Sequence, residues 1–359
     1  MNILLIGNDF HSIYYTRKEL ITELVKKNRV YVAIPDNNKN YLIEQLGAQL
    51  ITINLNRMGK NPFREILVIN KINEITKKTK ADIIFTFTIK PNLYTGLLQS
   101  PKTKKQIVTI TGLGRLFQKD NIIKKILIYF YRKSFQNVKS IIFENKENES
   151  IFTKLRIANG RHILVNGAGV NLDENPLESY PEDKDVLRIL FVGRIERDKG
   201  FIELYRAAQH YEKKNERIEF IILGSCEKTF EKEFKKMCIP NNMKLEGWQM
   251  NVHKYLKLSH AVILPSYHEG MANVLLEAAA AGRPILASRI HGCMESFEEG
   301  ESGLGFEKGN LEDMVRVIDK FVKMSNDDRK LMGLKGRHKM EREFDRKNVV
   351  DKFVEQIYE

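Results

Sequence analysis

Short apolar runs alternate with longer amphipathic stretches along the whole 359-residue chain. The runs lack a strict period of two, as strands buried on both faces do, and stretches such as Glu19–Lys27, Phe63–Lys78 and Ile122–Phe135 separate them. Strands that alternate with helices predict βαβ units and an α/β fold with parallel sheets. The strands expected in the first half are Ile3–Ile6, Val30–Ile34, Leu50–Ile53, Ile83–Phe87, Gln106–Ile110, Ser140–Phe143 and Ile163–Val165.

The pattern restarts in the second half after a polar, proline-marked stretch from Asn175 to Asp185, which is typical of a linker. We therefore expect two doubly wound, Rossmann-like domains, residues 1–175 and 186–344, that face a central cleft. A break at Glu341–Phe344 and a last helix are also expected, and this helix, about 345–359, can pack back on the first domain. The strands expected in the second half are Arg188–Val192, Glu219–Leu223, Lys244–Glu246, Ala261–Leu264 and Pro284–Ala287.

Composition and cysteine usage favour a globular cytoplasmic protein. Apolar residues make up 42% of the chain and charged residues 29%, which excludes collagen, coiled coil and disorder. No uncharged apolar run reaches the ~18 residues that a membrane-spanning helix needs. The N-terminal MNILLIGNDF is typical of a buried strand rather than of a signal peptide. Cys226, Cys238 and Cys293 lie far apart, without metal-ligand spacing, and are expected to be reduced thiols.

The positive charge is confined to one half of the chain. Residues 1–180 hold 28 Lys and Arg against 15 Asp and Glu, whereas residues 181–359 hold 31 of each. This asymmetry predicts that one face of the first domain meets an anionic partner: nucleic acid, a phosphorylated substrate or a membrane surface. A solvated lysine-rich surface is the alternative.

Loops that follow strands carry the candidate site residues, because ligands in doubly wound sheets bind at the carboxyl ends of strands. Gly7 ends the first strand and lets the backbone approach a ligand closely, but the loop is not G-x-G-x-x-G, and no P-loop motif occurs. In the second half, Arg194 ends a strand and Lys199 lies at a helix start. A guanidinium, an ammonium and helix-end amides together favour a diphosphate. Two ordinary surface cations are the alternative.

The segment from Pro265 to Pro284 carries two carboxylates, Glu269 before a helix and Glu277 inside it. Eight residues correspond to about 12 Å of helical rise, so the two cannot share one proton or one metal. We expect them to accept hydroxyl hydrogen bonds at two ends of an elongated ligand. The amides from Gly270 onward can take phosphate oxygens, and a ribose diol can satisfy Glu277. A salt-bridged helix glutamate is the alternative for Glu277.

These residues resemble a known family. The Glu269-x7-Glu277 spacing, with Gly193-Arg194 and Lys199 upstream, is similar to that of the retaining glycosyltransferases of family 4, whose GT-B fold has two Rossmann-like domains. The resemblance covers essentially the whole chain. Gly167–Asn171 resembles the segment before the family's linker and Leu245–Trp248 its base-binding loop. Thr88–Asn92 and Thr111–Gly114 resemble a subgroup that builds bacterial capsule, exopolysaccharide and O-antigen.

The resemblance implies a role for each matching residue. Arg194 and Lys199 would hold the donor diphosphate and stabilise its developing charge, Glu277 would bind the ribose, and Glu269 the donor sugar. The implied catalytic residues are Glu269, Arg194 and Lys199, and the implied donor-binding residues are Gly193, Arg194, Lys199, Gly247, Trp248, Glu269, Gly270, Met271, Ala272, Asn273 and Glu277. Many members place a histidine near the donor sugar, but this chain has none between His11 and His162, and its Thr109–Leu116 loop departs from that pattern.

The resemblance therefore implies a retaining hexosyltransferase. It would move a sugar from a nucleotide-sugar, UDP-hexose or UDP-N-acetylhexosamine, to a polyprenyl-diphosphate-linked glycan in surface polysaccharide synthesis. No metal or other cofactor is expected, since cations and helix-end amides would neutralise the diphosphate and no acidic cluster has metal-ligand spacing. Gly7, Arg17, Lys90 and Arg115 follow first-domain strands or their loops and are the expected acceptor-binding residues.

The basic first domain also predicts peripheral attachment to the inner face of the cell membrane. Ile122–Lys133 mixes Lys and Arg with Ile, Leu, Tyr and Phe, as an interfacial helix does, and Lys102–Lys105 adds charge. A buried helix with a cationic rim is the alternative.

Several other functions are consistent with parts of the sequence. A GT-B enzyme could act on a soluble or lipid acceptor outside repeat-unit synthesis, or resemble glycogen synthase or a non-hydrolysing sugar epimerase, although the Glu269/Glu277 pair disfavours the epimerase. A basic nucleic-acid-binding protein would explain the charge alone. It would need interleaved aromatic platforms or a reading helix, and neither is visible, so no nucleic-acid partner is expected.

Overall fold

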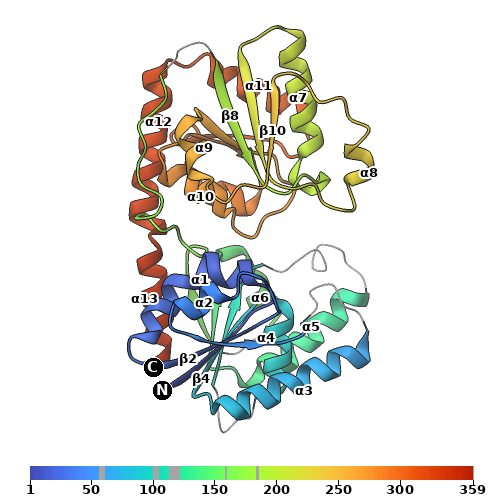
Figure 1. Cartoon of the computed structure of the whole chain (residues 1–359), viewed down its shortest axis with the longest axis vertical. Coiled ribbons are helices and arrows are strands. Elements are labelled where there is room, and N and C mark those ends of the chain that lie inside the picture. The colour runs from blue at the N-terminus through green and yellow to red at the C-terminus, as the bar shows by residue number, and fades with distance from the viewer. Residues whose placement is uncertain (56–60, 100–104, 113–121, 158–159, 183–185, 359) are drawn as a thin grey trace. The chain divides into compact units, whose positions relative to one another are not determined.

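The computed structural model describes residues 1–55, 61–99, 105–112, 122–157, 160–182 and 186–358, which form two compact units (Figure 1). Unit 1 comprises Met1–Gly169 together with Arg346–Glu359, and unit 2 comprises Val170–Asp345. The last helix of the chain therefore belongs to unit 1, although the whole of unit 2 precedes it in sequence.

Unit 1 is built on a seven-stranded sheet in the order β3-β2-β1-β4-β5-β6-β7, in which every pairing between the described strands is parallel. Strands are added outward on one side of β1 as far as β3, and the chain then crosses to β4 on the other side. The order thus reverses between β1 and β4. The strands are β1 (Asn2–Ile6), β2 (Arg29–Ile34), β3 (Gln49–Thr52), β4 (Ile83–Phe87), β5 (Gln106–Ile110), β6 (Ser140–Phe143) and β7 (Arg161–Leu164).

Helices cover both faces of this sheet, which explains why its strands are apolar on both sides. The helices are α1 (Phe10–Val25), α2 (Tyr41–Gln45), α3 (Pro62–Thr79), α4 (Ile89–Leu97), α5 (Ile122–Ser134), the short 3-10 helix η2 (Phe135–Asn137), α6 (Lys146–Lys154) and α13 (Arg346–Tyr358). The last of these, α13, lies beside α1 (Figure 1) and buries Val349, Phe353 and Ile357 in the core. The ring of Phe353 lies 5.9 Å from that of Phe85 in β4, so α13 is an integral part of unit 1.

Unit 2 repeats this design with a six-stranded parallel sheet in the order β10-β9-β8-β11-β12-β13. Its order reverses between β8 and β11. The strands are β8 (Leu187–Val192), β9 (Ile218–Leu223), β10 (Met243–Gly247), β11 (Ala261–Leu264), β12 (Ile285–Ser288) and β13 (Gly303–Phe306). The helices are η3 (Arg197–Lys199), α7 (Phe201–Lys213), α8 (Glu231–Phe234), α9 (His253–Leu258), α10 (Asn273–Ala280), η4 (His291–Ser296), α11 (Leu311–Val322), α12 (Asn326–Lys339) and the π-helical turn η5 (Met340–Phe344).

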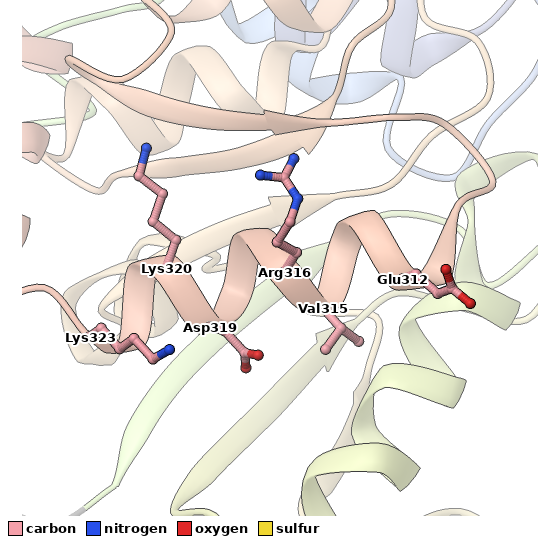
Figure 2. A pocket seen from close by; sticks show the side chains of 6 residues that line it. All are labelled: Glu312, Val315, Arg316, Asp319, Lys320 and Lys323. Carbon is pink, nitrogen blue, oxygen red and sulfur yellow. The ribbon is translucent and has the colours of Figure 1, made fainter.

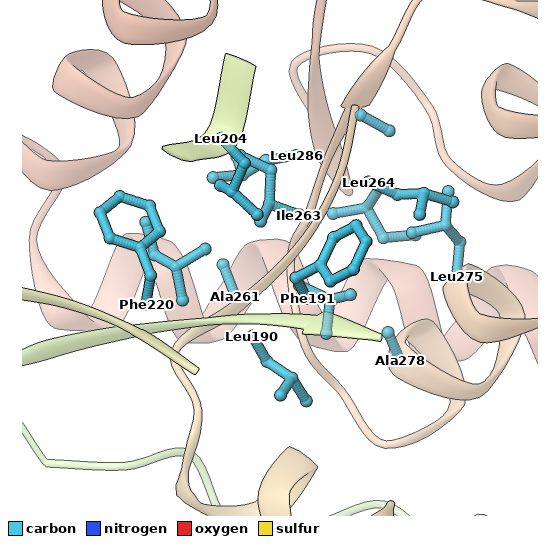
Figure 3. Packing of buried hydrophobic residues seen from close by; sticks show 14 of the residues in the cluster. Leu190, Phe191, Leu204, Phe220, Ala261, Ile263, Leu264, Leu275, Ala278 and Leu286 are labelled. Carbon is cyan, nitrogen blue, oxygen red and sulfur yellow. The ribbon is translucent and has the colours of Figure 1, made fainter. Parts of the chain in front are cut away.

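The core of unit 2 fixes the helix that carries one of the two carboxylates. Leu275 and Ala278 of α10 pack with Phe191 of β8 and Leu264 of β11, all of them at most 1% exposed (Figure 3). Burying large aliphatic and aromatic side chains is worth about 1.5–3 kcal/mol each. The position of α10 on the sheet is therefore set by its apolar face.

The expected linker packs on unit 2. The hydroxyl of Tyr180 donates to the carbonyl of His260 at 2.7 Å, and the buried Arg283 guanidinium donates to the carbonyl of Ser179 at 2.7 Å. The two compact units divide between Gly169 and Val170, whereas we expected the first domain to extend to residue 175.

Every strand predicted from the sequence is confirmed to within two residues at each end. The prediction missed β13, whose sequence Gly-Leu-Gly-Phe is too short and too rich in glycine to stand out. The predicted break at Glu341–Phe344 coincides with the π-helical turn η5. Within the described ranges, no helix combines the length and the apolar character needed to cross a membrane.

Candidate functional site

The carboxyl ends of β8 and β11 lie side by side where the strand order of unit 2 reverses. The pairs Ile189–Ala261 and Leu190–Val262 fix this register, so the residues just after Val192 and Leu264 emerge together. In open parallel sheets, ligands bind at such a reversal. Gly193 and Arg194 follow β8, and the loop that holds Glu269 follows β11.

An ion pair joins the two loops. The ammonium of Lys199 contacts Oε1 of Glu269, and the hydroxyl of Ser266 donates to the same oxygen at 2.6 Å. The Lys199 and Glu269 side chains are only 20% and 12% exposed. A partly buried, charge-assisted pair of this kind fixes both groups more firmly than a surface pair would.

Two glycines permit the close approach of these loops. Gly200 has φ +68°, and a Cβ there would lie 2.0 Å from the carbonyl oxygen of Pro265. Gly292 has φ +43°, and a Cβ there would lie 2.6 Å from the backbone oxygen of Glu269. Any side chain would force these backbones apart, so the positions of Lys199 and Glu269 depend on the two glycines.

Arg194 lies at the same edge of the sheet but is more open. Its guanidinium contacts Oε1 of Glu196 at 2.8 Å and Oε2 of Glu227 at 3.2 Å, and its side chain is 54% exposed. Two carboxylates orient the group while solvent still reaches it. The arrangement leaves a planar cation at the surface, which suits a phosphate ligand.

Glu269 and Glu277 are not on one helix. Helix α10 begins at Asn273, so Glu269 lies in the preceding loop, and the rise of about 12 Å expected for eight helical residues does not describe their separation. Glu277 lies in the second turn of α10 and is half-buried. The two carboxylates therefore occupy different elements.

The amides before α10 are partly engaged within the protein. The amide of Ala272 donates to the carbonyl of Gly292 at 2.8 Å, and that of Asn273 to the carbonyl of Met271 at 3.1 Å. Gly270 and Met271 complete the turn, and Met271 packs against the core of unit 2. Among the described residues, the buried Oδ1 of Asn273 has no hydrogen-bond partner, so it can accept a bond from a ligand hydroxyl.

Cys293 is close enough to Lys199 and Glu269 to feel the charge of both. It is fully buried, and burial raises the pKa of its thiol well above 9.0, with the Glu269 carboxylate adding to the shift and Lys199 opposing it. The thiol therefore stays neutral and packs in the core of unit 2.

The expected base-binding loop ends β10. Gly247 accepts a hydrogen bond from the amide of Gly224 at 2.8 Å, and the Trp248 side chain is 51% exposed. β10 is two strands from β8, about 10 Å by strand spacing. Trp248 thus follows a strand two places from β8 at the same edge of the sheet.

Unit 1 places two of its expected acceptor residues at the corresponding reversal. Gly7 directly follows β1, with its amide bonded to the carbonyl of Ala33 at 3.1 Å. Lys90 lies in the first turn of α4, just after β4. Its ammonium contacts Oε1 of Glu65 at 2.7 Å, and the lysine side chain is 16% exposed.

Arg17 is in the interior of unit 1. It is 3% exposed, pairs with the buried Glu144, and stacks over the rings of Phe87 and Phe353 at 5.0 and 5.2 Å. An acceptor-binding role would require the loss of these contacts. Arg115, the fourth expected residue, lies outside the described residues.

An open hollow on unit 2 contains none of the expected site residues. It runs along one face of α11 (Figure 2). Its lining residues are Glu312, Val315, Arg316, Asp319, Lys320 and Lys323. Asp319 accepts a hydrogen bond from the buried Tyr211 hydroxyl at 2.7 Å, which gives it a structural role. Across the described parts of both units, no group of three or more His, Cys, Asp or Glu side chains is placed to hold a metal.

Comparisons with known proteins agree with this architecture. Residues 2–145 match the family model described as glycosyl transferase 4-like, and residues 174–339 match that of glycosyl transferases group 1. The two units have the GT-B fold and define a glycosyltransferase. This chain belongs to the group 1, family 4-like glycosyltransferases.

Individual relatives are distant but span almost the whole chain. The chain is 24% identical over 336 residues to an N,N'-diacetylbacillosaminyl-diphospho-undecaprenol alpha-1,3-N-acetylgalactosaminyltransferase of Campylobacter jejuni, covering 89% of this chain and 88% of that protein. It is 25% identical to the capsular polysaccharide biosynthesis glycosyltransferase CapM of Staphylococcus aureus, covering 79% and 78%. The crystal structure of Anabaena HepE in complex with UDP and glucose superposes with a TM-score of 0.80 at 15% identity, covering 100% and 99%.

The sequence did not reveal the residues that support the site. Ser266 lies three residues before Glu269 and could have been noticed as a partner in the same loop. Glu227, which orients Arg194, comes from the loop after β9, 33 residues away, and nothing local marks it. Such partners become visible only when the strand order is known.

Proposed function

We propose that this chain transfers a sugar from a nucleotide-sugar to a polyprenyl-diphosphate-linked glycan, with retention of anomeric configuration, in bacterial surface polysaccharide synthesis. The observation that carries the proposal is the Lys199–Glu269 pair at the β8/β11 reversal, with Arg194 beside it. Two cations and a carboxylate at one edge of the sheet support the binding of a ligand that carries both phosphates and hydroxyls.

In this proposal, Lys199 and Arg194 stabilise the negative charge that develops on the leaving diphosphate. Preorganised donors that stabilise developing charge commonly contribute more to such catalysis than any other effect. The two side chains are held by Glu269 and by Glu196 and Glu227, so little reorganisation is needed. We propose that they act without a divalent metal.

Glu269 would then accept hydrogen bonds from hydroxyls of the donor sugar, and Glu277 from the ribose. The buried Oδ1 of Asn273 supports the sugar end of this arrangement, because it lacks a partner among the described residues. Trp248, which is half exposed at the end of β10, would cover the base. UDP is the proposed nucleotide, supported by the UDP and glucose bound to HepE.

The proposed reaction proceeds on one face of the sugar. The bond from the anomeric carbon to the diphosphate oxygen breaks, the acceptor oxygen bonds to the same face, and its proton passes to the leaving phosphate. No carboxylate nucleophile is needed for this path. The anomeric configuration of the product, read by NMR, tests it.

The acceptor is proposed from the relatives and from the charge of unit 1. The Campylobacter jejuni relative is named for a diphospho-undecaprenol acceptor, and CapM for capsular polysaccharide biosynthesis. Residues 1–180 carry an excess of 13 positive charges, which suits a lipid diphosphate at an anionic surface.

We also propose that the enzyme is cytoplasmic and attaches to the inner face of the cell membrane through α5. Tyr131 of α5 is buried in the core, whereas Ile126, Tyr129 and Phe130 on other sides are 44–58% exposed. The ammonium of Lys133 lies 5.9 Å from the Tyr129 ring. Exposed apolar side chains among cations are typical of an interfacial helix.

An assay with purified enzyme tests the proposal as a whole. UDP-sugars are offered singly with an undecaprenyl-diphosphate-linked monosaccharide in detergent, and the extended lipid is detected by mass spectrometry. A new lipid-linked disaccharide supports the proposal. Hydrolysis of the donor alone, with every acceptor unchanged, would contradict it.

A further inference from the structure

The first two turns of α3 carry large apolar side chains in solvent. Phe63 is 78% exposed, Leu67 67% and Ile66 54%. These positions lie three and four residues apart and therefore share one side of the helix. We call Phe63, Ile66 and Leu67 the α3 patch.

The residues of the α3 patch do not belong to the side of the helix that packs in the core of unit 1. The opposite side of the helix buries Ile72 and Ile75 in unit 1, and partly buries Val68. The helix is well started, because Asn61 accepts hydrogen bonds from the amides of Phe63 and Arg64. The patch thus faces outward from a firmly anchored helix.

The same turns of α3 hold the cation at the β1/β4 reversal. Glu65, between two patch residues in sequence, accepts from Lys90 at 2.7 Å and from the Tyr94 hydroxyl at 2.5 Å. Lys90 and Tyr94 both belong to α4. Glu65 therefore connects the Lys90 ammonium, which it contacts directly, to the helical turns that carry the α3 patch.

The charges around the patch favour an anionic partner with an apolar tail. Arg64 is exposed beside the patch, whereas Lys77 and Lys78 are exposed at the far end of the same helix, about 15 Å or more away, so the cations near the patch are Arg64 and Lys90. A lysine ammonium on a four-carbon stem can exchange one anion for another without backbone movement. A protein partner would account for the exposed apolar side chains, but it would not account for the Lys90 ammonium at the β1/β4 reversal.

We propose that the α3 patch contacts the lipid surface where the acceptor emerges, and that Lys90 exchanges Glu65 for the acceptor's diphosphate. When Lys90 moves away, Glu65 still accepts the hydrogen bond from the Tyr94 hydroxyl. The inference rests on the proposed lipid-diphosphate acceptor. It assigns that acceptor a binding path in unit 1 that runs from Phe63 to Lys90.

Vesicle binding tests this path without any sugar transfer. Phosphatidylcholine vesicles carry either a few per cent of undecaprenyl diphosphate or, in the plain vesicles, phosphatidylglycerol of the same total charge, so the general attraction of basic residues to anionic lipids is the same for both. Wild-type enzyme should bind the diphosphate-containing vesicles about tenfold more tightly than the plain ones. Phe63→Ser/Leu67→Ser should weaken binding to both by about tenfold or more.

The Lys90→Gln variant should bind both kinds of vesicle equally, with the affinity that the wild-type enzyme has for plain vesicles. Leu331→Ser, which removes a 53% exposed leucine from α12 of unit 2, is the matched control and should behave as the wild type. Circular dichroism confirms that each variant is folded.

The outcomes separate the inference from the proposed function. Wild-type-like binding by the α3 variant, or a preserved diphosphate preference in Lys90→Gln, would overturn the inference and leave the proposed acceptor intact. A wild-type enzyme with no preference for diphosphate vesicles would count against the acceptor itself. A wild-type dimer that the α3 variant dissociates would assign the patch to a second copy of the chain and overturn the inference.

Discussion

Lys199 and Glu269 are 70 residues apart in sequence, yet their side chains form an ion pair between the loops after β8 and β11. Gly200 and Gly292 make the approach possible, and Ser266 shares the carboxylate oxygen. The pair joins the proposed diphosphate-binding cation to the proposed sugar-binding carboxylate. Each residue therefore positions the other.

Loss of either proposed diphosphate cation should slow turnover while the fold survives. A charge-assisted contact is worth about 1.5–3 kcal/mol, so Lys199→Ala and Arg194→Ala should each lower kcat about tenfold to a hundredfold. Lys235→Ala is the matched control, because Lys235 is a salt-bridged lysine on the same unit with a 70% exposed side chain. Wild-type kinetics in both site variants would contradict the assignment of Lys199 and Arg194 to the donor diphosphate.

Substitutions of Glu277 and Glu269 should have different effects on UDP binding and on turnover. Glu277→Gln should weaken UDP binding, because a ribose contact serves the ground state, whereas Glu269→Gln should chiefly lower turnover. Calorimetry with UDP alone distinguishes them. If Glu269→Gln loses affinity for UDP and Glu277→Gln retains it, the roles are reversed.

Activity should persist in excess EDTA, because two cations are proposed to neutralise the diphosphate. Turnover is measured with and without chelator and after Mg²⁺ or Mn²⁺ is added back. A complete loss that either metal restores would show that a divalent ion takes part.

Membrane attachment through α5 should depend on charge. Each basic residue near an anionic leaflet contributes about 1 kcal/mol, so Lys124→Glu/Lys125→Glu should sharply reduce sedimentation with anionic liposomes at low salt. Lys235→Glu in unit 2 serves as the control. Binding that neither salt nor the α5 variant affects would leave the attachment without support.

The Glu178–His253 contact at the start of unit 2 should make stability depend on pH. The hydrogen bond from His253, at 2.7 Å, lowers the pKa of Glu178 below its ordinary 4.5, with burial opposing and Lys257 adding. A depressed carboxyl pKa stabilises the fold above pH 4.5, and this contribution is lost as the pH falls through the folded-state pKa. Glu178→Gln should thus cost about 0.5–1.5 kcal/mol at about pH 7 and less at about pH 3, measured by urea unfolding. An equal cost at both pH values would contradict the assignment.

Local patterning was sufficient to predict the strands but not the partners of the site residues. Gln106–Ile110 and Ala261–Leu264 were predicted to the residue, because buried parallel strands are short continuous apolar runs. Burial by distant elements was not predictable: Arg17 resembles a surface cation in sequence, yet Glu144 and Phe353 enclose it. The extent of the linker was also beyond sequence reasoning, because its attachment to unit 2 depends on Arg283 and His260.

The central claim is that the chain moves a sugar from a nucleotide-sugar to a lipid-linked acceptor with retention. The most direct measurement is the anomeric configuration of the product, by NMR coupling constants, after reaction with the UDP-sugar that the enzyme uses and an undecaprenyl-diphosphate-linked monosaccharide. The account predicts an extended lipid-linked glycan whose new linkage has the same anomeric configuration as the donor. An inverted linkage, or no transfer from any nucleotide-sugar, would contradict it.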